Sequence, residues 1–425
     1  MSAKHIFFLT SVSKSLYYGT SQRHVEQSGD FLDSSLRQLS HSRVIVALLF
    51  NVKREAMQEQ GSPTPTSSPL DLPSSTLLQV NSELSSIRKP EPSAIANDLY
   101  AEWDTMETVE AVKSAIEEHH EVLMIEADEH AYGKLLRQKP DFVFNMSEGL
   151  HGVSREAQIP AMLEMLHLPY LGSDPLTLGM CLDKARTKEI LSYHRIPNAP
   201  FAVVRTMEEF EDTRVRFPAM VKPLHEGSSK GIFNSCLVAN TEELQRETER
   251  ILKTYGQPAL VEEFLPGREF TVAILGNGVS ARTLPIVEIR FDALPAGVNP
   301  IYSYEAKWIW DKAENPLEIF QCPAQLDGEL QEQIERICLE AYGALSCRDW
   351  ARVDVRLNRA GKPCILEINP LPGILPKPED NSCFPKAARA AGMSYNELIL
   401  TVLQIAFTRC RLATSPRKTP AAVIA

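Results

Sequence analysis

The chain has 425 residues, of which 44% are hydrophobic and 23% are charged, as is usual for a globular protein. At about 150 residues per domain, this length predicts two or three domains and a sizeable core. The 55 acidic residues outnumber the 44 basic ones and give a net charge of −11. A general nucleic-acid binder is therefore not expected, because such a protein needs a basic face.

The eight cysteines occur singly, and no two have the CxxC spacing of a zinc knuckle or a redox motif. This usage predicts buried, reduced thiols in a cytoplasmic protein. No apolar run approaches the roughly 20 residues of a membrane span, so no membrane partner is expected. The mildly basic, Ser-rich residues 1–43 are interpreted as a disordered leader, with a transit peptide or a misassigned start codon as alternatives.

The first regular structure is predicted at residues 43–50, where a continuous apolar run is typical of a buried parallel strand. A disordered insertion is predicted at about 54–98, because its central part is dense in Ser and Pro and lacks apolar periodicity. Helices and strands then alternate, which predicts an open parallel α/β domain over residues 44–172. The predicted elements are a helix starting near residue 106, a strand at 121–125, a helix at 132–137, a strand at 142–145 and a helix at 156–167.

Beyond residue 172 the pattern changes to strand pairs flanked by helices, which predicts α+β architecture. We assign two lobes to residues 173–264 and 265–413, and a tail to 414–425. The predicted helices lie at about 182–194, 241–254, 328–345 and 394–409, and the predicted strands at 200–204, 218–222, 258–262, 269–275, 350–357 and 363–367.

A metal site is predicted on the last strand pair, which a short turn joins into a hairpin. Asp354 lies on one strand, and Glu367 and Asn369 lie two residues apart on the other, so the latter two share a face. Two carboxylates and an amide oxygen are ligands suited to Mg²⁺. The alternative is a polar hairpin in solvent, but the flanking residues are apolar and favour burial of these groups.

Two further segments have the composition of a nucleotide site. Lys222 ends a predicted strand, and the loop after it contains Ser228 and Ser229 between two glycines. Such a loop can close over phosphates through its N–H groups and hydroxyls, although its spacing is not that of a P-loop. An apolar strand also runs into Glu262, turns at residues 266–267 and resumes at Glu269, and such a hinge can offer backbone groups to a purine. Taken alone, each segment is more often an ordinary turn.

In their order along residues 142–407, these segments resemble the ATP-grasp superfamily and, within it, D-alanine–D-alanine ligase. The resemblance implies an N-terminal parallel α/β domain, the pre-ATP-grasp domain, followed by a two-lobed ATP-grasp domain. It also implies ATP and two Mg²⁺ ions, with Mn²⁺ as a possible substitute, small amino-acid substrates and a homodimer. The segments that carry it include Asp183-Lys184, Tyr304-Glu305-Ala306-Lys307, Arg352-Val353-Asp354 and Glu367-Ile368-Asn369.

The resemblance further implies a role for each matching residue. The residues expected to bind the nucleotide are Lys184, Lys222, Ser229, Glu262, Phe264, Leu265 and Glu269. The residues expected to hold the metal ions are Asp354, Glu367 and Asn369. The expected catalytic residues are Ser228, which positions substrate, Lys307, which reaches the γ-phosphate, Glu102, which binds the first amino group, and Arg352 and Gly373, which stabilise the tetrahedral intermediate. Ser382 is expected to bind the carboxylate of the second amino acid.

The implied activity joins two amino acids through an acyl phosphate, with D-alanine as the default substrate and peptidoglycan precursor synthesis as the role. A ligase for a different amino-acid pair, or an inactive nucleotide-binding regulator, is the alternative. The substrate side departs from the family: Asn51-Val52-Lys53 replaces a glycine-rich turn, and Trp308 stands where the family usually has tyrosine. Because an indole donates but does not accept hydrogen bonds, Trp308 predicts weak use of D-alanine. Alternatively, Trp308 only covers the site as a lid.

Overall fold

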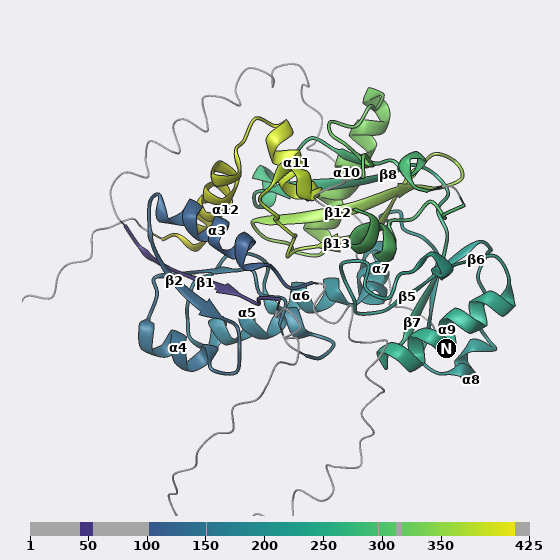
Figure 1. Ribbon diagram of the computed structural model, residues 1–425, viewed down its shortest axis with the longest axis horizontal. Helices are drawn as coiled ribbons and strands as arrows, with labels where there is room; N and C mark the ends of the chain where they lie inside the picture. Colours follow the sequence, from purple (N-terminus) through teal and green to yellow (C-terminus); the bar gives the residue numbers. More distant parts are fainter. Residues whose placement is uncertain (1–42, 54–101, 150, 296, 312–316, 413–425) are drawn as a thin grey trace, which may run out of the picture. The chain divides into compact units, whose positions relative to one another are not determined.

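The computed structural model contains three β-sheets within the residues that it describes (Figure 1). The described residues are 43–53, 102–149, 151–295, 297–311 and 317–412. The predicted insertion at 54–98, the leader except Arg43, and the tail lie outside them. No helix in the described part of the chain is both long and apolar enough to cross a membrane.

The three sheets come from successive parts of the chain. A parallel sheet has the order β2-β1-β3 and contains β1 (Ile45–Phe50), β2 (Glu121–Glu126) and β3 (Phe142–Asn145). An antiparallel sheet has the order β4-β7-β5-β6 and contains β4 (Phe201–Val204), β5 (Ala219–Pro223), β6 (Leu237–Val238) and β7 (Ala259–Glu263). A second antiparallel sheet has the order β11-β10-β8-β12-β13, with β9 paired to β8, and contains β8 (Glu269–Leu275), β9 (Arg282–Thr283), β10 (Val287–Ile289), β11 (Phe320–Gln321), β12 (Trp350–Leu357) and β13 (Pro363–Asn369).

Helices cover these sheets. The α-helices are α3 (Met106–Glu117), α4 (Ala131–Gln138), α5 (Arg155–Met165), α6 (Pro175–Leu182), α7 (Lys184–Tyr193), α8 (Met207–Phe210), α9 (Thr241–Tyr255), α10 (Gly328–Ala344), α11 (Cys383–Ala390) and α12 (Tyr395–Cys410). The parallel sheet followed by antiparallel sheets confirms the predicted fold class. The helices predicted at 241–254, 328–345 and 394–409 are confirmed to within one residue at each end.

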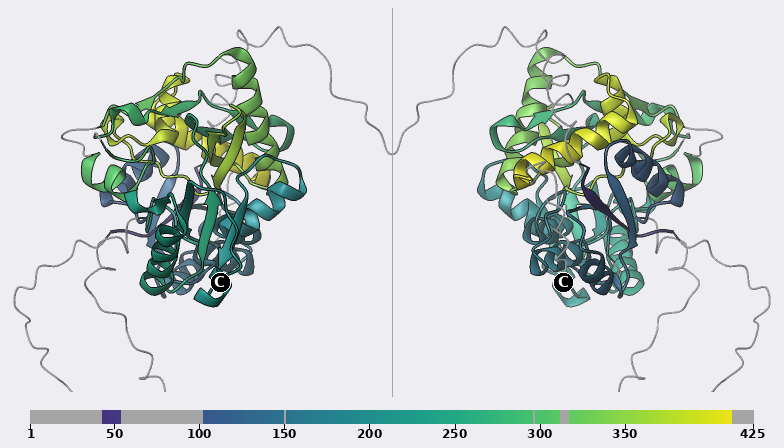
Figure 2. Two further views of the ribbon diagram at one scale, coloured as in Figure 1. Left: turned by 90° about the vertical axis from the view of Figure 1, so that its right-hand side faces the viewer. Right: turned by 90° about the vertical axis from the view of Figure 1, so that its left-hand side faces the viewer.

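Strand β1 is buried on both faces, as its continuous apolar run predicts. Val46, Leu48 and Phe50 share a core with residues of α3 and α12, whereas Ala47 and Leu49 pack with residues of α4 and α5. Figure 2 shows the last helix, in yellow, running beside the blue helix α3. The C-terminal end of the ordered chain therefore covers one face of the N-terminal sheet.

The helix predicted at about 182–194 is confirmed as α7, to within two residues at each end, whereas the helix before it, α6, was not predicted. Asp183 has an extended ψ of 98°, so it ends α6 and cannot continue the helix. Its carboxylate accepts hydrogen bonds from the backbone N–H groups of Ala185 and Arg186 and caps α7. This cap fixes where α7, which begins at Lys184, enters the site.

The short helix α11 and the segment Glu305–Trp310, a π-helix, were not predicted. Both are shorter than the window of roughly 11 residues over which helical periodicity becomes a reliable signal. Both elements carry residues expected at the site, which makes their placement a property of the tertiary structure.

Asp349, on the turn before β12, ties three parts of the chain together. Its side chain is fully buried, and Arg409 of α12 donates to both carboxylate oxygens, at 2.8 and 2.7 Å. The N–H of Gly172, after the parallel sheet, donates to the same carboxylate at 2.8 Å, and Asn277, after β8, donates at 2.9 Å. This one carboxylate therefore links the segment after the N-terminal sheet, the last helix and the C-terminal sheet.

We expect Asp349→Asn to lower the free energy of unfolding by about 3–5 kcal/mol, because it leaves the guanidinium of Arg409 without its buried counter-charge. Asn has nearly the same shape and tolerates the positive φ of 65° at this position, so strain does not contribute. Urea denaturation measures the change. The matched control is Asp292→Asn, which removes the carboxylate of an exposed Arg290–Asp292 pair and should leave stability unchanged. Equal effects of the two variants would contradict the role given to Asp349.

Candidate active site

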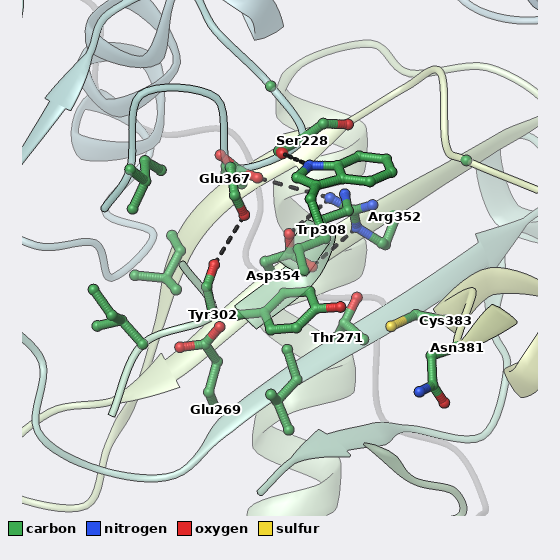
Figure 3. Close-up of a pocket in the computed structure, with 18 of the residues that line it drawn as sticks. Ser228, Glu269, Thr271, Tyr302, Trp308, Arg352, Asp354, Glu367, Asn381 and Cys383 are labelled. Atoms are coloured by element: carbon green, nitrogen blue, oxygen red, sulfur yellow. Dashed lines mark hydrogen bonds and ion pairs between the residues drawn. The ribbon is translucent and has the colours of Figure 1, made fainter. Parts of the chain in front are cut away.

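A pocket of about 370 Å³ receives side chains from both antiparallel sheets (Figure 3). All residues expected at the site line it, except Lys184 and Asn369. In Figure 3, Arg352, Asp354 and Glu367 are joined by dashed lines in the middle, with Glu269 on one side and Cys383 on the other. The pocket therefore brings together expected site residues that are up to 280 positions apart, from Glu102 to Ser382.

The centre of the pocket is built on the paired strands β12 and β13. Their register places Asp354 opposite Glu367 and Arg352 opposite Asn369. Arg352 donates to both oxygens of Asp354, at 3.1 and 2.9 Å, and its Nη2 lies 3.7 Å from Glu367 Oε1. A register shift after Asp354 interrupts the regular ladder next to these side chains. One guanidinium thus lies between two carboxylates.

The pKa values of Asp354 and Glu367 shift in opposite directions. Burial raises the pKa of Asp354, and the charge of Glu367 raises it further, although Arg352 opposes both effects. Burial also penalises ionised Glu367, but Lys184, Arg352 and Lys222 outweigh that penalty and lower its pKa. Glu367 is therefore the more strongly ionised of the pair, and a cation near both would favour their ionised forms.

The third expected metal ligand, Asn369, is oriented by the backbone. Its Oδ1 accepts a hydrogen bond from the N–H of Leu371 at 3.0 Å and retains a second lone pair. Among the described residues, no group of three or more His, Cys, Asp or Glu side chains is arranged to hold a metal ion. The set that fits Mg²⁺ is accordingly two carboxylates and one amide oxygen.

A buried ion-pair network connects α7 with β5 and β7. Glu262 is only 1% exposed, and its two oxygens lie 2.5 Å from Lys222 Nζ and 2.8 Å from Lys188 Nζ. Burial alone would raise the pKa of Glu262, but the two lysines outweigh it and lower the pKa to about 2. Lys188 was not predicted, although its spacing of four residues from Lys184 places both lysines on one side of a helix.

The hinge between β7 and β8 is held by Arg356, which the sequence analysis also missed. Its Nη1 donates to Glu269 Oε2 at 2.7 Å, and its guanidinium lies 4.5 Å from the ring centroid of Phe264. Burial raises the pKa of Glu269, although Arg356 opposes the shift. Phe264 and Leu265, expected at the nucleotide base, both line the pocket beside this stack.

The Ser228–Ser229 loop is held from three directions. Both serines have positive φ values, of 50° and 60°, a conformation that costs a residue other than glycine about 1–3 kcal/mol. Trp308 Nε1 donates to the backbone carbonyl of Ser228 at 3.0 Å, and Ser229 Oγ donates to the carbonyl of Tyr302 at 2.9 Å. Gly227 N donates to Glu102 at 2.6 Å. The strain is offset by contacts that fix the loop over the pocket.

Glu102, expected to bind the first amino group, is engaged by protein groups. Nη2 of the buried residue Arg155 donates to both carboxylate oxygens, at 2.8 and 2.7 Å, in addition to the bond from Gly227. Arg155 Nη1 also donates to the carbonyl of His225 at 2.8 Å. In this arrangement Glu102 anchors the Ser228–Ser229 loop through Gly227. No sequence pattern pointed to Arg155.

The remaining expected residues close the pocket. Burial, reinforced by the charge of Arg352, lowers the pKa of Lys307 to about 8. Ser382 Oγ donates to the carbonyl of Gly373 at 3.2 Å and accepts from the N–H of Leu375 at 3.2 Å. Lys184, although outside the lining, bonds to the carbonyl of Glu226, and its Nζ lies 3.8 Å from Glu367 Oε2.

A parallel sheet followed by two antiparallel sheets around one charged pocket is an α/β ATP-grasp fold. Two solved structures of D-alanine–D-alanine ligase from Bacillus anthracis share it. One, complexed with ATP, is 20% identical with a TM-score of 0.56, and the other is 22% identical with a TM-score of 0.59. Each comparison covers 87% of this chain and 99% of the ligase chain.

The family model described as "D-ala D-ala ligase C-terminus" matches residues 190–404. The chain belongs to the D-alanine–D-alanine ligase family. The D-alanine–D-alanine ligase of Bordetella avium is 35% identical over 63% of this chain and 79% of its own length, and that of Bordetella pertussis is 36% identical over 62% and 78%. The uncharacterized protein y4sG of Sinorhizobium fredii is 37% identical over 72% of this chain and 89% of its own length.

We expect Lys188→Met to destabilise the protein by about 1–3 kcal/mol at neutral pH, because it removes one of two counter-charges from Glu262. Folding lowers the pKa of Glu262 from 4.5 to about 2, so its ionised form stabilises the protein above pH 4.5, and this contribution is lost as the pH falls toward 2. The deficit of the variant should therefore shrink between neutral pH and about pH 3. Urea denaturation at the two pH values measures it.

The control for this experiment is Lys253→Met, which removes the cation of an exposed pair with Glu249 on α9. It should cause little change at either pH. A Lys188→Met deficit that is the same at both pH values would show that lost packing, and not the charge on Glu262, accounts for it.

Proposed function

We propose that this protein is an ATP- and Mg²⁺-dependent carboxylate–amine ligase that joins two amino acids. The observation that carries the proposal is the β12–β13 centre, where Arg352 lies between Asp354 and Glu367 in the same pocket as Lys222 and Lys307. Phosphoryl transfer is catalysed mainly by positioning and by neutralising negative oxygens, and this pocket supplies both kinds of group. The names of the Bordetella relatives support amino acids as substrates, and they name D-alanine as both partners of the reaction.

The nucleotide would lie between the two antiparallel sheets. Its phosphates are anionic and bind ammonium and N–H groups. They would therefore face the side chains of Lys184 and Lys222 and the loop at Ser229. Phe264 and Leu265 offer an apolar surface to the base, and Glu269 offers an acceptor to the ribose hydroxyls. Glu262, whose oxygens face Lys188 and Lys222, would orient Lys222 toward the phosphates. The ATP complex of the Bacillus anthracis ligase, which shares the fold, supports this assignment.

Asp354, Glu367 and Asn369 would hold the metal ions, of which we propose two. Their oxygens are the ligands that Mg²⁺ prefers, and the guanidinium of Arg352 between the two carboxylates indicates that the site attracts positive charge. When bound, Mg²⁺ neutralises phosphate oxygens and polarises the γ-phosphorus; Mn²⁺ has the same ligand preference.

The proposed reaction has two steps. The carboxylate of the first amino acid, positioned by Ser228 and Glu102, attacks the γ-phosphorus while the bond to the β-phosphate oxygen breaks, and Lys307 faces the transferred group. The amine of the second amino acid, whose carboxylate would bind Ser382, then attacks the acyl carbon, and phosphate leaves. Arg352 and the N–H of Gly373 would stabilise the oxyanion of the tetrahedral intermediate.

The same proposal includes a cytoplasmic homodimer that acts in peptidoglycan precursor synthesis. Release of ADP, measured with pairs of D- and L-amino acids, tests the activity. Release that depends on both an acid and an amine supports a ligase. ATP binding without release for any pair would instead favour a nucleotide-binding regulator.

We expect Glu367→Gln to reduce ADP release at least about 100-fold, because the neutral amide would be a weaker ligand for Mg²⁺ than the carboxylate. The fold should persist, since Glu367 is one-third exposed and its amide analogue has the same shape. Turnover and circular dichroism are measured together. Glu332→Gln, on the exposed surface of α10, is the charge-matched control. Near-normal turnover of the Glu367 variant would remove this residue from the metal site.

A further inference from the structure

The segment after β1 brings an unassigned lysine to the pocket wall. Val52 forms a parallel bridge with Asp104, in which Lys53 N donates to Asp104 O at 2.8 Å and Asp104 N donates to Asn51 O at 3.1 Å. These backbone bonds fix the position of Lys53, whose side chain lines the pocket. Its Nζ lies 4.2 Å from the ring centroid of Trp308, within the range of a cation–π contact.

A second lysine lies over the ring of Trp308. Lys307 Nζ lies 5.2 Å from the same centroid. Across the residues that the structure describes, neither lysine forms an ion pair with a carboxylate, unlike Lys184, Lys188 and Lys222. Burial lowers the pKa of Lys53, and Asp104 partly opposes the shift. Within the described part of the chain, this end of the pocket therefore presents two ammonium groups that no carboxylate pairs directly.

The acidic groups nearby are poorly suited to bind the ammonium of a simple amino acid. Glu102 already accepts from Arg155 and from Gly227 N. Burial raises the pKa of Asp104 to about 7, although Lys53 opposes the shift, so Asp104 is often protonated at neutral pH. A small zwitterion such as D-alanine would therefore meet Lys53 there without gaining a carboxylate partner from Glu102 or Asp104.

We propose that Lys53, held on the ring of Trp308, is the specificity-determining residue for a carboxylate donor that carries a second acidic group. The proposal rests on the ligase function proposed above and names the substrate class of that site: a dicarboxylic amino acid, such as D-glutamate or D-aspartate, in place of D-alanine. One carboxylate of such a donor reaches the reacting centre, and the other pairs with Lys53. The indole N–H of Trp308, bonded to Ser228, keeps the ring in place beneath the ammonium.

The test is equilibrium binding to the full chain, measured by calorimetry with a non-hydrolysable ATP analogue and Mg²⁺ present. D-glutamate or D-aspartate should bind at least about tenfold more tightly than D-alanine, because a charged hydrogen bond is gained. Lys53→Met should abolish this advantage, Lys53→Arg should retain most of it, and Lys53→Glu should reverse it. Lys134→Met, at a surface ion pair with Asp128, should leave it unchanged.

D-alanine binding as tightly as the acidic donors, or a Lys53→Met variant with an unchanged ratio of affinities, would overturn the proposal. Turnover is measured separately with hydroxylamine, an amine that converts an acyl phosphate to a hydroxamate. Tight, Lys53-dependent binding of the acidic donors without hydroxamate would contradict the ligase function while supporting the assignment of Lys53. Hydroxamate formed preferentially from D-alanine would contradict the assignment of Lys53 while supporting the ligase function.

Discussion

Buried carboxylates need counter-charges, and this requirement recurs throughout the protein. Glu262 is ionised inside the protein only because Lys188 and Lys222 face it. The same rule joins Asp354 to Arg352 in the pocket and Asp349 to Arg409 far from it. Breaking any of these pairs leaves an uncompensated charge inside the protein.

The same ion pairs prepare the site for its proposed chemistry. A lysine held by a buried carboxylate is already oriented toward the pocket, so little side-chain freedom remains to be lost when an anion arrives. The groups proposed to hold metal lie on β12 and β13, whose ladder fixes their separation. The strained serine loop and the segment Glu305–Trp310 are less regular and meet at Trp308. Rigid strands thus carry the proposed metal ligands, and loops carry the groups proposed to contact substrate.

The residues proposed to hold metal and phosphate and those proposed to choose the substrate come from different parts of this protein. The first set lies on β12, β13 and the lysine-bearing elements of the two antiparallel sheets. The second set includes Lys53, which lies on the ring of Trp308, and Glu102, which is bound by Arg155. A change of charge at one wall can alter which acid binds without disturbing the phosphate chemistry, since the two sets of residues come from different parts of the chain.

The sequence by itself determined the fold class and much of the proposed site. Apolar runs and helical periodicity predicted β1, α9, α10 and α12, and the spacing of Asp354, Glu367 and Asn369 predicted one polar face, because these signals are local. Only the tertiary structure decided the burial of Lys188 against Glu262 and the contact of Glu102 with Arg155. The last contact joins residues 53 positions apart, and that of Lys53 with Trp308 spans 255. Such contacts depend on how loops close over a pocket, which periodicity and composition do not encode.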